Sequence, residues 1–261
     1  MTVPFKVVIP ARYASTRLPG KLLLPIDGIP LLQHVFEAAR ASRAGTVVIA
    51  TDDERIKTTA EAFGASVVMT SADHQSGTDR IAEAVTKLRE PDDAIIVNVQ
   101  GDEFGLPPAI INQLAMTLWD NPGNPMATLC EKVTNKADLT NPHVVKVIVD
   151  HDKSAIYFSR SAIPWFERAG ELSVQEFPYQ PYRHIGIYAY RTGFLKTFTS
   201  LAQCPLEVSE KLEQLRALYH GYKIRVELAC AACGLEVNTL DDLERVRKTA
   251  TSYKLQEIRS L

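Results

Sequence analysis

Residues 5–21 read F-K-V-V-I-P-A-R-Y-A-S-T-R-L-P-G-K, a short apolar run that passes directly into a polar, cationic loop. The run Val7–Ile9 shows no alternation of polar and apolar residues, so Phe5–Pro10 is predicted to form a strand buried on both faces. Such strands occur in parallel sheets that helices cover from two sides. We therefore expect an α/β fold whose first strand delivers residues 11–21 to the edge of a sheet.

The rest of the chain continues this alternation of strand and helix. Further strands are predicted over 46–50, 66–70, 94–99, 144–150, 155–159, 184–190 and 223–229, and helices over 30–39, 53–63, 78–89, 107–119, 205–218 and 240–253. Because such alternation implies right-handed crossovers, the predicted fold is Rossmann-like, with a mostly parallel or mixed sheet, helices on both faces and a smaller inserted subdomain. The polar connection over 167–181 is a candidate mobile or interface loop.

The composition argues against several functional classes. Of the 261 residues, 46% are hydrophobic and 23% are charged, and a net charge of −2 provides no basic field for nucleic acid or anionic lipid. No apolar run approaches the roughly 20 residues that span a bilayer, so no membrane insertion is expected. The first residues enter a strand without the longer apolar stretch of a signal peptide, which predicts a cytoplasmic protein.

Cys230 and Cys233 have the C-x-x-C spacing of metal sites and redox motifs. The sequence contains no second Cys or His pair at a matching spacing, and four cysteines are too few for a disulfide framework in a chain of this size. The favoured interpretation is therefore reduced structural thiols.

Polar loops follow three of the predicted strands, over 11–21, 71–77 and 100–105. Ligands of open α/β sheets bind beyond the carboxyl ends of strands, where these loops should lie. In the first loop, Arg12, Arg17 and Lys21 can hold a triphosphate through guanidinium forks and a point charge. The alternative is a solvated basic loop. Neither a Walker P-loop nor a G-x-G-x-x-G motif is present.

The other two loops contain candidate contacts to a metal ion and to a base. Asp102 follows a buried strand, and a carboxylate there suits Mg²⁺, which takes one or two carboxylates plus substrate phosphates. The alternative is an ordinary turn aspartate. Ser76 and Gly77 allow close backbone approach to a flat ligand, with Arg80 one turn into the next helix. His74 is interpreted as a surface-loop histidine rather than a general base.

Motifs in both halves of the chain occur in an order that is specific to one family. They are P-A-R-Y-A-S-T-R-L-P-G-K (10–21), A-T-D-D-E-R-I (50–56), D-H-Q-S-G-T-D-R (73–80), V-N-V-Q-G-D-E (97–103), Y-F-S-R-S-A-I-P-W (157–165), R-H-I-G-I-Y-A-Y-R (183–191), K-L-E-Q-L-R (211–216) and D-D-L-E-R-V-R (241–247). This set closely resembles bacterial 3-deoxy-manno-octulosonate cytidylyltransferases, also called CMP-Kdo synthetases, over nearly the whole chain. The residues alone indicate a magnesium-dependent nucleotide transferase but not the sugar.

The resemblance implies a nucleotide-diphospho-sugar transferase-like α/β fold and a single domain over 1–261. Residues 1–125 would mainly bind nucleotide, and about 140–220 would contribute sugar-acid binding and homodimer contacts. The implied reaction forms CMP-3-deoxy-manno-octulosonate and pyrophosphate from CTP and the acidic eight-carbon sugar, with Mg²⁺, in lipopolysaccharide biosynthesis. The anomeric hydroxyl would attack the α-phosphorus in line, and the protein would supply positioning and charge neutralisation.

The resemblance also assigns roles to individual residues. Arg12, Lys21 and Asp102 would be catalytic, with Asp102 and Asn238 at the metal; Pro10, Ala11, Arg12, Arg17, Lys21, Ser76, Gly77, Arg80 and Gln100 would bind the nucleotide; Arg160, His184, Tyr188, Glu213 and Gln214 would bind the sugar acid. Without the resemblance, a strand-end histidine such as His184 is more often structural, and Glu213 and Gln214 would be assigned to a solvated helix face.

The chain departs from the family pattern at two positions. Phe104 stands where a proline usually follows G-D-E, which changes loop stiffness rather than reacting groups. Asn238 stands in E-V-N-T-L-D-D-L where the family usually has the second metal-binding aspartate. Losing that charge at about 4 Å and a dielectric near 20 removes about 4 kcal/mol of attraction per unit of cation charge, as an upper bound. Glu236 faces the same side of an extended segment and offers a replacement carboxylate, which is the less favoured explanation.

Two alternative functions remain open at this point. One is a cytidylyltransferase for a related acidic sugar, such as the 8-amino octulosonate or a sialic acid, although 183–190 and 211–216 match the octulosonate group. The other is a catalytically weakened paralogue that binds nucleotide, which Asn238 supports and the retained cationic loop opposes.

Overall fold

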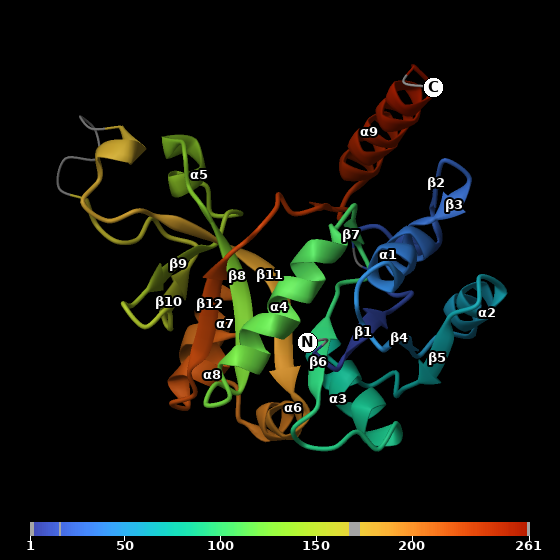
Figure 1. Ribbon diagram of the computed structural model, residues 1–261, viewed down its shortest axis with the longest axis horizontal. Coiled ribbons are helices and arrows are strands. Elements are labelled where there is room, and N and C mark those ends of the chain that lie inside the picture. Colours follow the sequence, from blue (N-terminus) through green and yellow to red (C-terminus); the bar gives the residue numbers. More distant parts are fainter. Residues whose placement is uncertain (1–2, 16, 167–172, 260–261) are drawn as a thin grey trace.

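The computed structural model describes residues 3–15, 17–166 and 173–259, with side chains up to residue 250. Residues 167–172 of the expected polar connection lie outside this set. In the described part of the chain, a nine-stranded sheet forms the centre of the molecule, with helices on both sides (Figure 1). Its strands are β1 (Phe5–Ala11), β4 (Thr46–Thr51), β5 (Ser66–Met69), β6 (Ile95–Asn98), β8 (Met126–Lys132), β9 (Lys146–Val149), β10 (Ala155–Ser159), β11 (Tyr182–Arg191) and β12 (Ile224–Leu228).

The sheet has a parallel half and a mixed half. The strand order is β10-β9-β11-β6-β1-β4-β5, with β8 paired to both β11 and β12. Strands β6, β1, β4 and β5 run parallel, whereas β11 runs antiparallel to β6, β8 and β9. The predicted α/β fold with a mixed sheet is therefore confirmed. Two further sheets have two strands each: β2 (Pro25–Ile26) pairs with β3 (Ile29–Pro30), and β7 (Glu103–Phe104) pairs with β13 (Leu235–Glu236).

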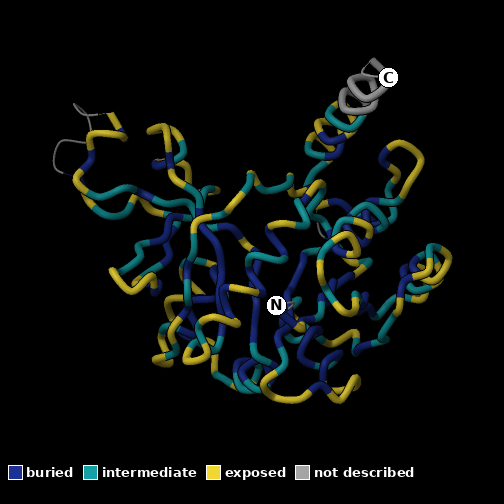
Figure 2. Tube along the Cα trace, viewed as in Figure 1, coloured by how far each residue is buried: buried dark blue, intermediate teal, exposed yellow. Residues whose placement is uncertain are grey.

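The continuous apolar run of β1 is explained by burial on both faces of the sheet. Val7 and Ile9 belong to one hydrophobic core, and Val8 belongs to a second core on the opposite face. Figure 2 shows that buried residues follow the central strands. Since successive side chains of a strand point to opposite faces, both faces of β1 need apolar partners. A third, small core is formed by Val133, Leu139, Phe166, Val174 and Phe177.

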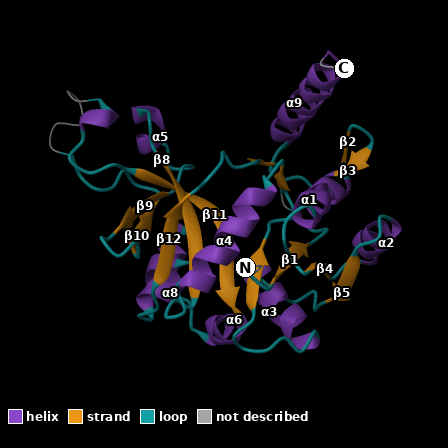
Figure 3. Ribbon diagram, in the orientation of Figure 1, coloured by secondary structure: helices purple, strands orange, loops and turns teal. Residues whose placement is uncertain are grey.

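The helices divide between the two faces (Figure 3). The first core contains residues from α1 (Leu31–Arg40), α2 (Glu54–Ala62), α4 (Pro108–Asp120) and α9 (Leu240–Arg259). The second core contains residues from α3 (Gly77–Lys87), α6 (Thr192–Ser200) and α8 (Leu215–Tyr219). Further short helical segments are α5 (Lys136–Thr140), α7 (Pro205–Glu210) and the 3₁₀ turns η1 (Lys21–Leu23) and η2 (Val174–Glu176). The buried face of α1 is the predicted one. None of the helices in the described part of the chain is both long and apolar enough to cross a membrane.

The single helix predicted over 205–218 is wrong. Lys211 adopts a left-handed conformation with φ of 56°, which ends α7 and separates it from α8. Glu207 and Arg216 form a buried ion pair across the break, with an Oε1–Nη2 distance of 2.6 Å. Apolar periodicity did not reveal the break, because the bent segment still directs Leu212 and Leu215 into the core.

Strand β8 was missing from the sequence prediction, although it lies at the centre of the mixed half. It pairs antiparallel with β11 and parallel with β12, and its first five residues are buried. The run M-A-T-L-C is short and contains residues compatible with helix or strand, so local pattern alone did not assign it. Its two neighbours along the sheet decide its conformation.

Lys146 in β9 is a fully buried cation that organises the loops around it. Its Nζ donates to the carbonyls of Asn141 at 2.9 Å, Val144 at 2.6 Å and Arg160 at 2.6 Å. Burial lowers the pKa of this ammonium, yet its three donors are all used by main-chain acceptors. Lys146 therefore ties the 141–144 loop to the end of β10, where Arg160 lies.

We expect Lys146→Met to lower the free energy of unfolding by about 2–4 kcal/mol, because the buried carbonyls lose their donor. Urea denaturation measures this change. Lys223→Met, at an exposed position, is the control and should stay within about 0.5 kcal/mol of the natural protein. Equal stabilities for the two variants would show that Lys146 has no organising role.

Candidate active site

A polar cavity of about 210 Å³ lies beyond the carboxyl ends of β1 and β6, where an open parallel sheet places its ligands. It is lined by Pro10, Ala11, Arg12, Ser15, Arg17, Lys21, Leu22, His74, Gln75, Ser76, Gly77, Arg80, Gln100, Gly101, Asp102 and Asn238. Every residue predicted to bind nucleotide or metal is in this set. The set also contains residues that the prediction missed, such as Ser15 and Gln75, which belong to the same quoted motifs.

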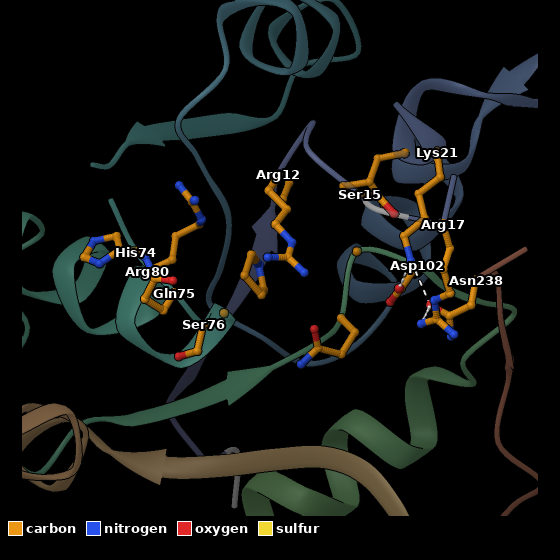
Figure 4. Close-up of a pocket in the computed structure, with 16 residues that line it drawn as sticks. Arg12, Ser15, Arg17, Lys21, His74, Gln75, Ser76, Arg80, Asp102 and Asn238 are labelled. Atoms are coloured by element: carbon orange, nitrogen blue, oxygen red, sulfur yellow. Dashed lines mark hydrogen bonds and ion pairs between the residues drawn. The ribbon is translucent and has the colours of Figure 1, made fainter. Parts of the chain in front are cut away.

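Two cations of the first loop, Arg17 and Lys21, lie against Asn238 and Asp102 (Figure 4). The Nζ of Lys21 forms an ion pair with Asp102 and donates to the Oδ1 of Asn238 at 3.0 Å. The Nη2 of Arg17 donates to the same Oδ1 at 2.8 Å. Arg12 lies between this group and the Ser76 side of the cavity, and it has no ion-pair partner among the described residues.

The side-chain oxygens of Asp102 and Asn238 suit a divalent cation because they converge on one point. The Asp102 carboxylate and the Asn238 carbonyl already share one positive group, the Lys21 ammonium, so they converge on a single point that favours positive charge. Carboxylate and amide oxygens are the ligand types that Mg²⁺ takes. Among the described residues no group of three or more His, Cys, Asp or Glu side chains converges as a metal site, so substrate phosphates and water would complete the coordination.

The β7–β13 pair joins the two segments that contain Asp102 and Asn238. Glu103 pairs with Glu236 in register, and the Val237 N–H donates to the Asp102 carbonyl at 3.0 Å. Burial, together with the charges of Glu236 and Asp102, raises the pKa of Glu103 to about 7. Burial and Asp102 likewise raise the pKa of Glu236. The segment therefore concentrates negative charge behind the cationic loop.

The Ser76 side of the cavity is built around the start of α3. The Ser76 hydroxyl accepts from the Asp79 N–H at 3.1 Å as the helix cap. Gly77 packs on Pro10, where an added Cβ would lie 3.4 Å from the proline ring. Arg80 is 3% exposed, pairs with Asp52 at 3.3 Å and donates to the Thr70 hydroxyl at 2.5 Å. Its charge is therefore largely balanced before any ligand enters.

His74 lies in the loop before α3, as expected, and it also lines the cavity. Its Nε2 forms a short contact with the Glu83 carboxylate, which also accepts from the Ser71 N–H at 2.8 Å and pairs with Lys87 at 2.7 Å. Burial raises the pKa of Glu83, but the hydrogen bonds from Lys87, Ser71 and His74 outweigh it and lower the pKa to about 2. Glu83 thus anchors the loop.

A second cavity of about 380 Å³ adjoins the first across the β7–β13 pair. Its lining includes Glu103, His143, Arg183, His184, Tyr188, Leu212, Gln214, Cys233 and Glu236. Of the predicted sugar-acid residues, His184, Tyr188 and Gln214 line it. Burial lowers the pKa of His184 to about 3, so the ring is neutral at pH 7, and it lies 3.0 Å from the Thr128 hydroxyl.

The remaining two predicted sugar-acid residues lie outside the linings of both cavities. Arg160 donates to the carbonyls of Glu210 at 2.7 Å and Pro142 at 3.0 Å. Glu213 is half-buried and accepts from the Thr78 hydroxyl at 2.6 Å, which links the start of α8 to the start of α3. Burial raises its pKa, and its Oε1 has no hydrogen-bond partner among the described residues.

Of the cysteines, Cys233 lines the second cavity. All four are free thiols, with Cys130 and Cys204 buried. Burial and the neighbouring carboxylates of Glu131 and Glu103 raise the pKa of Cys233 to about 12, which disfavours the reactive thiolate.

The fold and the two cavities define the class of protein. A cationic loop after the first parallel strand, a carboxylate after β6 and a second polar cavity beside them are the features of an α/β nucleotide-binding transferase. A family profile described as cytidylyltransferase matches residues 6–224. The chain belongs to this family, among the 3-deoxy-manno-octulosonate cytidylyltransferases.

Two curated relatives illustrate the match. The 3-deoxy-manno-octulosonate cytidylyltransferase of Francisella philomiragia is 51% identical over 249 residues, which are 94% of this chain and 98% of the relative. The enzyme of the same name from Thioalkalivibrio sulfidiphilus is 51% identical over 244 residues, with the same coverage of both chains.

Solved structures agree in fold. A CMP:2-keto-3-deoxy-manno-octonic acid synthetase complexed with CTP superposes with a TM-score of 0.88 at 41% identity, covering 96% of this chain and 99% of that one. A cytidylyltransferase from Leptospira borgpetersenii shares the fold, with a TM-score of 0.60 at 19% identity, covering 95% of this chain and 85% of the other.

The position of Gly234 predicts the effect of a side chain next to the β7–β13 pair, which separates the two cavities. A Cβ at this position would lie 2.3 Å from the Phe104 carbonyl oxygen, so Gly234→Ala should separate β13 from β7. We expect a loss of about 1–3 kcal/mol in the free energy of unfolding and weaker CTP binding, because Asn238 moves away from Lys21. Calorimetry of unfolding and of CTP binding tests both. Gly123→Ala, where an added Cβ meets no described atom within 4 Å, is the control.

Glu83 generates a prediction about acid stability. Its folded-state pKa of about 2 lies below the ordinary 4.5, so its contribution is complete above about pH 5 and is lost as the pH falls from 4.5 to 2. Its side chain is 24% exposed, so we expect Glu83→Gln to cost about 1–2 kcal/mol at pH 7. In urea denaturation the gap from the natural protein should close near pH 2. The exposed Glu61→Gln should show no such gap, and a pH-independent gap for Glu83→Gln would contradict the assignment.

Proposed function

We propose that the protein transfers CMP from CTP to 3-deoxy-manno-octulosonate and releases pyrophosphate, with Mg²⁺, in lipopolysaccharide biosynthesis. We propose further that it acts in the cytoplasm as a homodimer. The names of the relatives and of the CTP-bound neighbour support the substrates. The proposal rests on the adjacency of the two cavities. Residues that are neighbours in the chain line one cavity or the other.

This adjacency occurs at the β7–β13 wall. Asp102 lines the first cavity and Glu103 lines the second; likewise Asn238 lines the first and Glu236 lines the second. A nucleotide in the first cavity and a sugar acid in the second would therefore meet at one junction. Holding two reactants in contact is the main contribution of a protein to phosphoryl transfer.

The residues of the first cavity suit a triphosphate whose terminal part must leave as pyrophosphate. Arg12 and Arg17 offer planar forks for phosphate oxygens, and Lys21 offers a point charge. In the proposed reaction the anomeric oxygen of the sugar bonds to the α-phosphorus, the bond from that phosphorus to the bridging oxygen breaks, and the hydroxyl proton passes to water. The cations neutralise the charge that develops on the departing pyrophosphate.

Asp102 and Asn238 would hold the Mg²⁺, which supplies further charge neutralisation on the phosphates when it is bound. Lys21 contacts both of these residues, so binding of the nucleotide phosphates would compete with Asp102 for its ammonium. In that way the substrate itself would release the metal-binding carboxylate from its ion pair.

The neutral His184, Tyr188 and the cationic Arg183 line the second cavity. Such a lining suits a polyhydroxylated acid, since hydroxyls need donors and acceptors and the carboxylate needs a positive partner. Arg183 already pairs with Glu131, at 2.8 Å from its Nε, which fixes the direction of its guanidinium.

Pyrophosphate release from CTP, followed across a Mg²⁺ titration, tests the proposal. We expect turnover with 3-deoxy-manno-octulosonate and a decrease of about 10²–10³-fold in kcat/KM for Lys21→Met, because a preorganised charge is lost at the leaving group. The surface variant Lys57→Met should retain the natural rate.

The same assay distinguishes the alternatives. Faster turnover with the 8-amino octulosonate or a sialic acid would reassign the sugar. CTP binding without turnover of any of these acids, at every Mg²⁺ concentration, would identify a weakened paralogue and reject the proposed activity.

A further inference from the structure

Asn238 has two chemically different ends, and the structure gives each a different partner. Its Oδ1 accepts from Lys21 and Arg17, as described above, whereas its Nδ2 donates to the Glu236 Oε2 at 2.9 Å. A carboxylate can only accept a hydrogen bond, so Glu236 selects the NH₂ end of the amide. The carbonyl oxygen is thereby turned toward the cations of the first cavity.

The backbone around this pair is held from both sides. The Val237 N–H bonds to the Asp102 carbonyl at 3.0 Å, and the Asn238 N–H bonds to the Asp242 carboxylate at 3.0 Å. With the main chain fixed, rotation of the Asn238 side chain is the remaining freedom. Glu236 at the Nδ2 end, together with Lys21 and Arg17 at the Oδ1 end, restricts that rotation.

Charge makes Asn238 and Glu236 a matched pair. An aspartate at position 238 would place a second carboxylate oxygen about 3 Å from the Glu236 Oε2, and like charges at this distance repel strongly. With asparagine the contact is a hydrogen bond, and the combined formal charge of positions 236 and 238 remains −1. This is the charge that a single aspartate at 238 beside a neutral residue at 236 would provide.

We propose that Glu236 is a positioning residue for the cation site, and that the Glu236–Asn238 pair replaces a single metal-binding aspartate. The amide supplies the ligand oxygen, and the carboxylate behind it supplies the orientation and the negative charge. The inference rests on the proposed function in that the cation is the one that accompanies CTP.

A double-mutant cycle tests this coupling. The four proteins are the natural chain, Glu236→Gln, Asn238→Asp and the double variant. Gln keeps the shape of Glu, but it can donate as well as accept, so it no longer selects one end of the amide. The measured quantity is the dissociation constant of Mn²⁺ in the presence of saturating CTP, from the electron paramagnetic resonance signal of free Mn²⁺.

We expect Glu236→Gln to weaken Mn²⁺ binding about tenfold when residue 238 is asparagine, and by less than about twofold when it is aspartate. Asp241→Asn, an exposed carboxylate in the first turn of α9, removes the same charge nearby and should leave the constant unchanged. Equal factors in both backgrounds would reduce Glu236 to a general charge effect and overturn the proposal. No effect in the asparagine background would overturn it as well.

Two controls separate this inference from other failures. Thermal unfolding and CTP binding in the presence of a chelator show whether each variant is folded and retains its nucleotide site. The Mn²⁺ titration needs neither sugar acid nor turnover, so a negative result in the pyrophosphate assay would leave the coupling measurable. Conversely, if turnover is normal and Glu236→Gln changes the Mn²⁺ dissociation constant by the same factor in both backgrounds, the coupling between Glu236 and Asn238 is rejected. The proposed function then still stands.

Discussion

The parallel pairing of β1 between β4 and β6 is the constraint on which the site depends. Parallel strands end at the same edge of the sheet, so the loop after β1 and the loop after β6 must lie side by side. This brings Lys21 against Asp102, which are 81 residues apart in the chain. The burial of both faces of β1 maintains the arrangement, because the strand cannot shift by one residue without exchanging the two cores.

The electrostatics of the site follow from this arrangement. Arg80 is already paired with Asp52, and Lys21 is shared between Asp102 and Asn238, so the structure holds part of its positive charge in internal contacts. Arg12 provides charge that no described residue balances with an ion pair. A triphosphate would therefore meet an attractive field and would reorganise the contacts of Lys21 as it binds.

The β7–β13 pair shows how the end of the chain completes the site. Its two strands have only two residues each, yet they place Asn238 beside a loop from the first half of the chain. The close approach of Gly234 to the Phe104 backbone allows this pairing. The same pairing brings Glu103 against Glu236. Burial and the charges of Glu236 and Asp102 raise the pKa of Glu103, and burial and the charge of Asp102 raise the pKa of Glu236.

Local sequence determined the elements that carry strong signals and the chemical character of their loops. The sequence predicts the uninterrupted apolar run of β1, the apolar face of α1 and the cation-rich loop at 11–21. Burial on both faces, helical periodicity and phosphate affinity each depend on residues that are neighbours in the chain. Tertiary structure alone decided the break at Lys211, the insertion of β8 between β11 and β12, and the separation of Arg160 from the second cavity. It also decided that Glu236 contacts the amide of Asn238, since hydrogen bonds and charges act through space and depend on positions that only the folded chain sets.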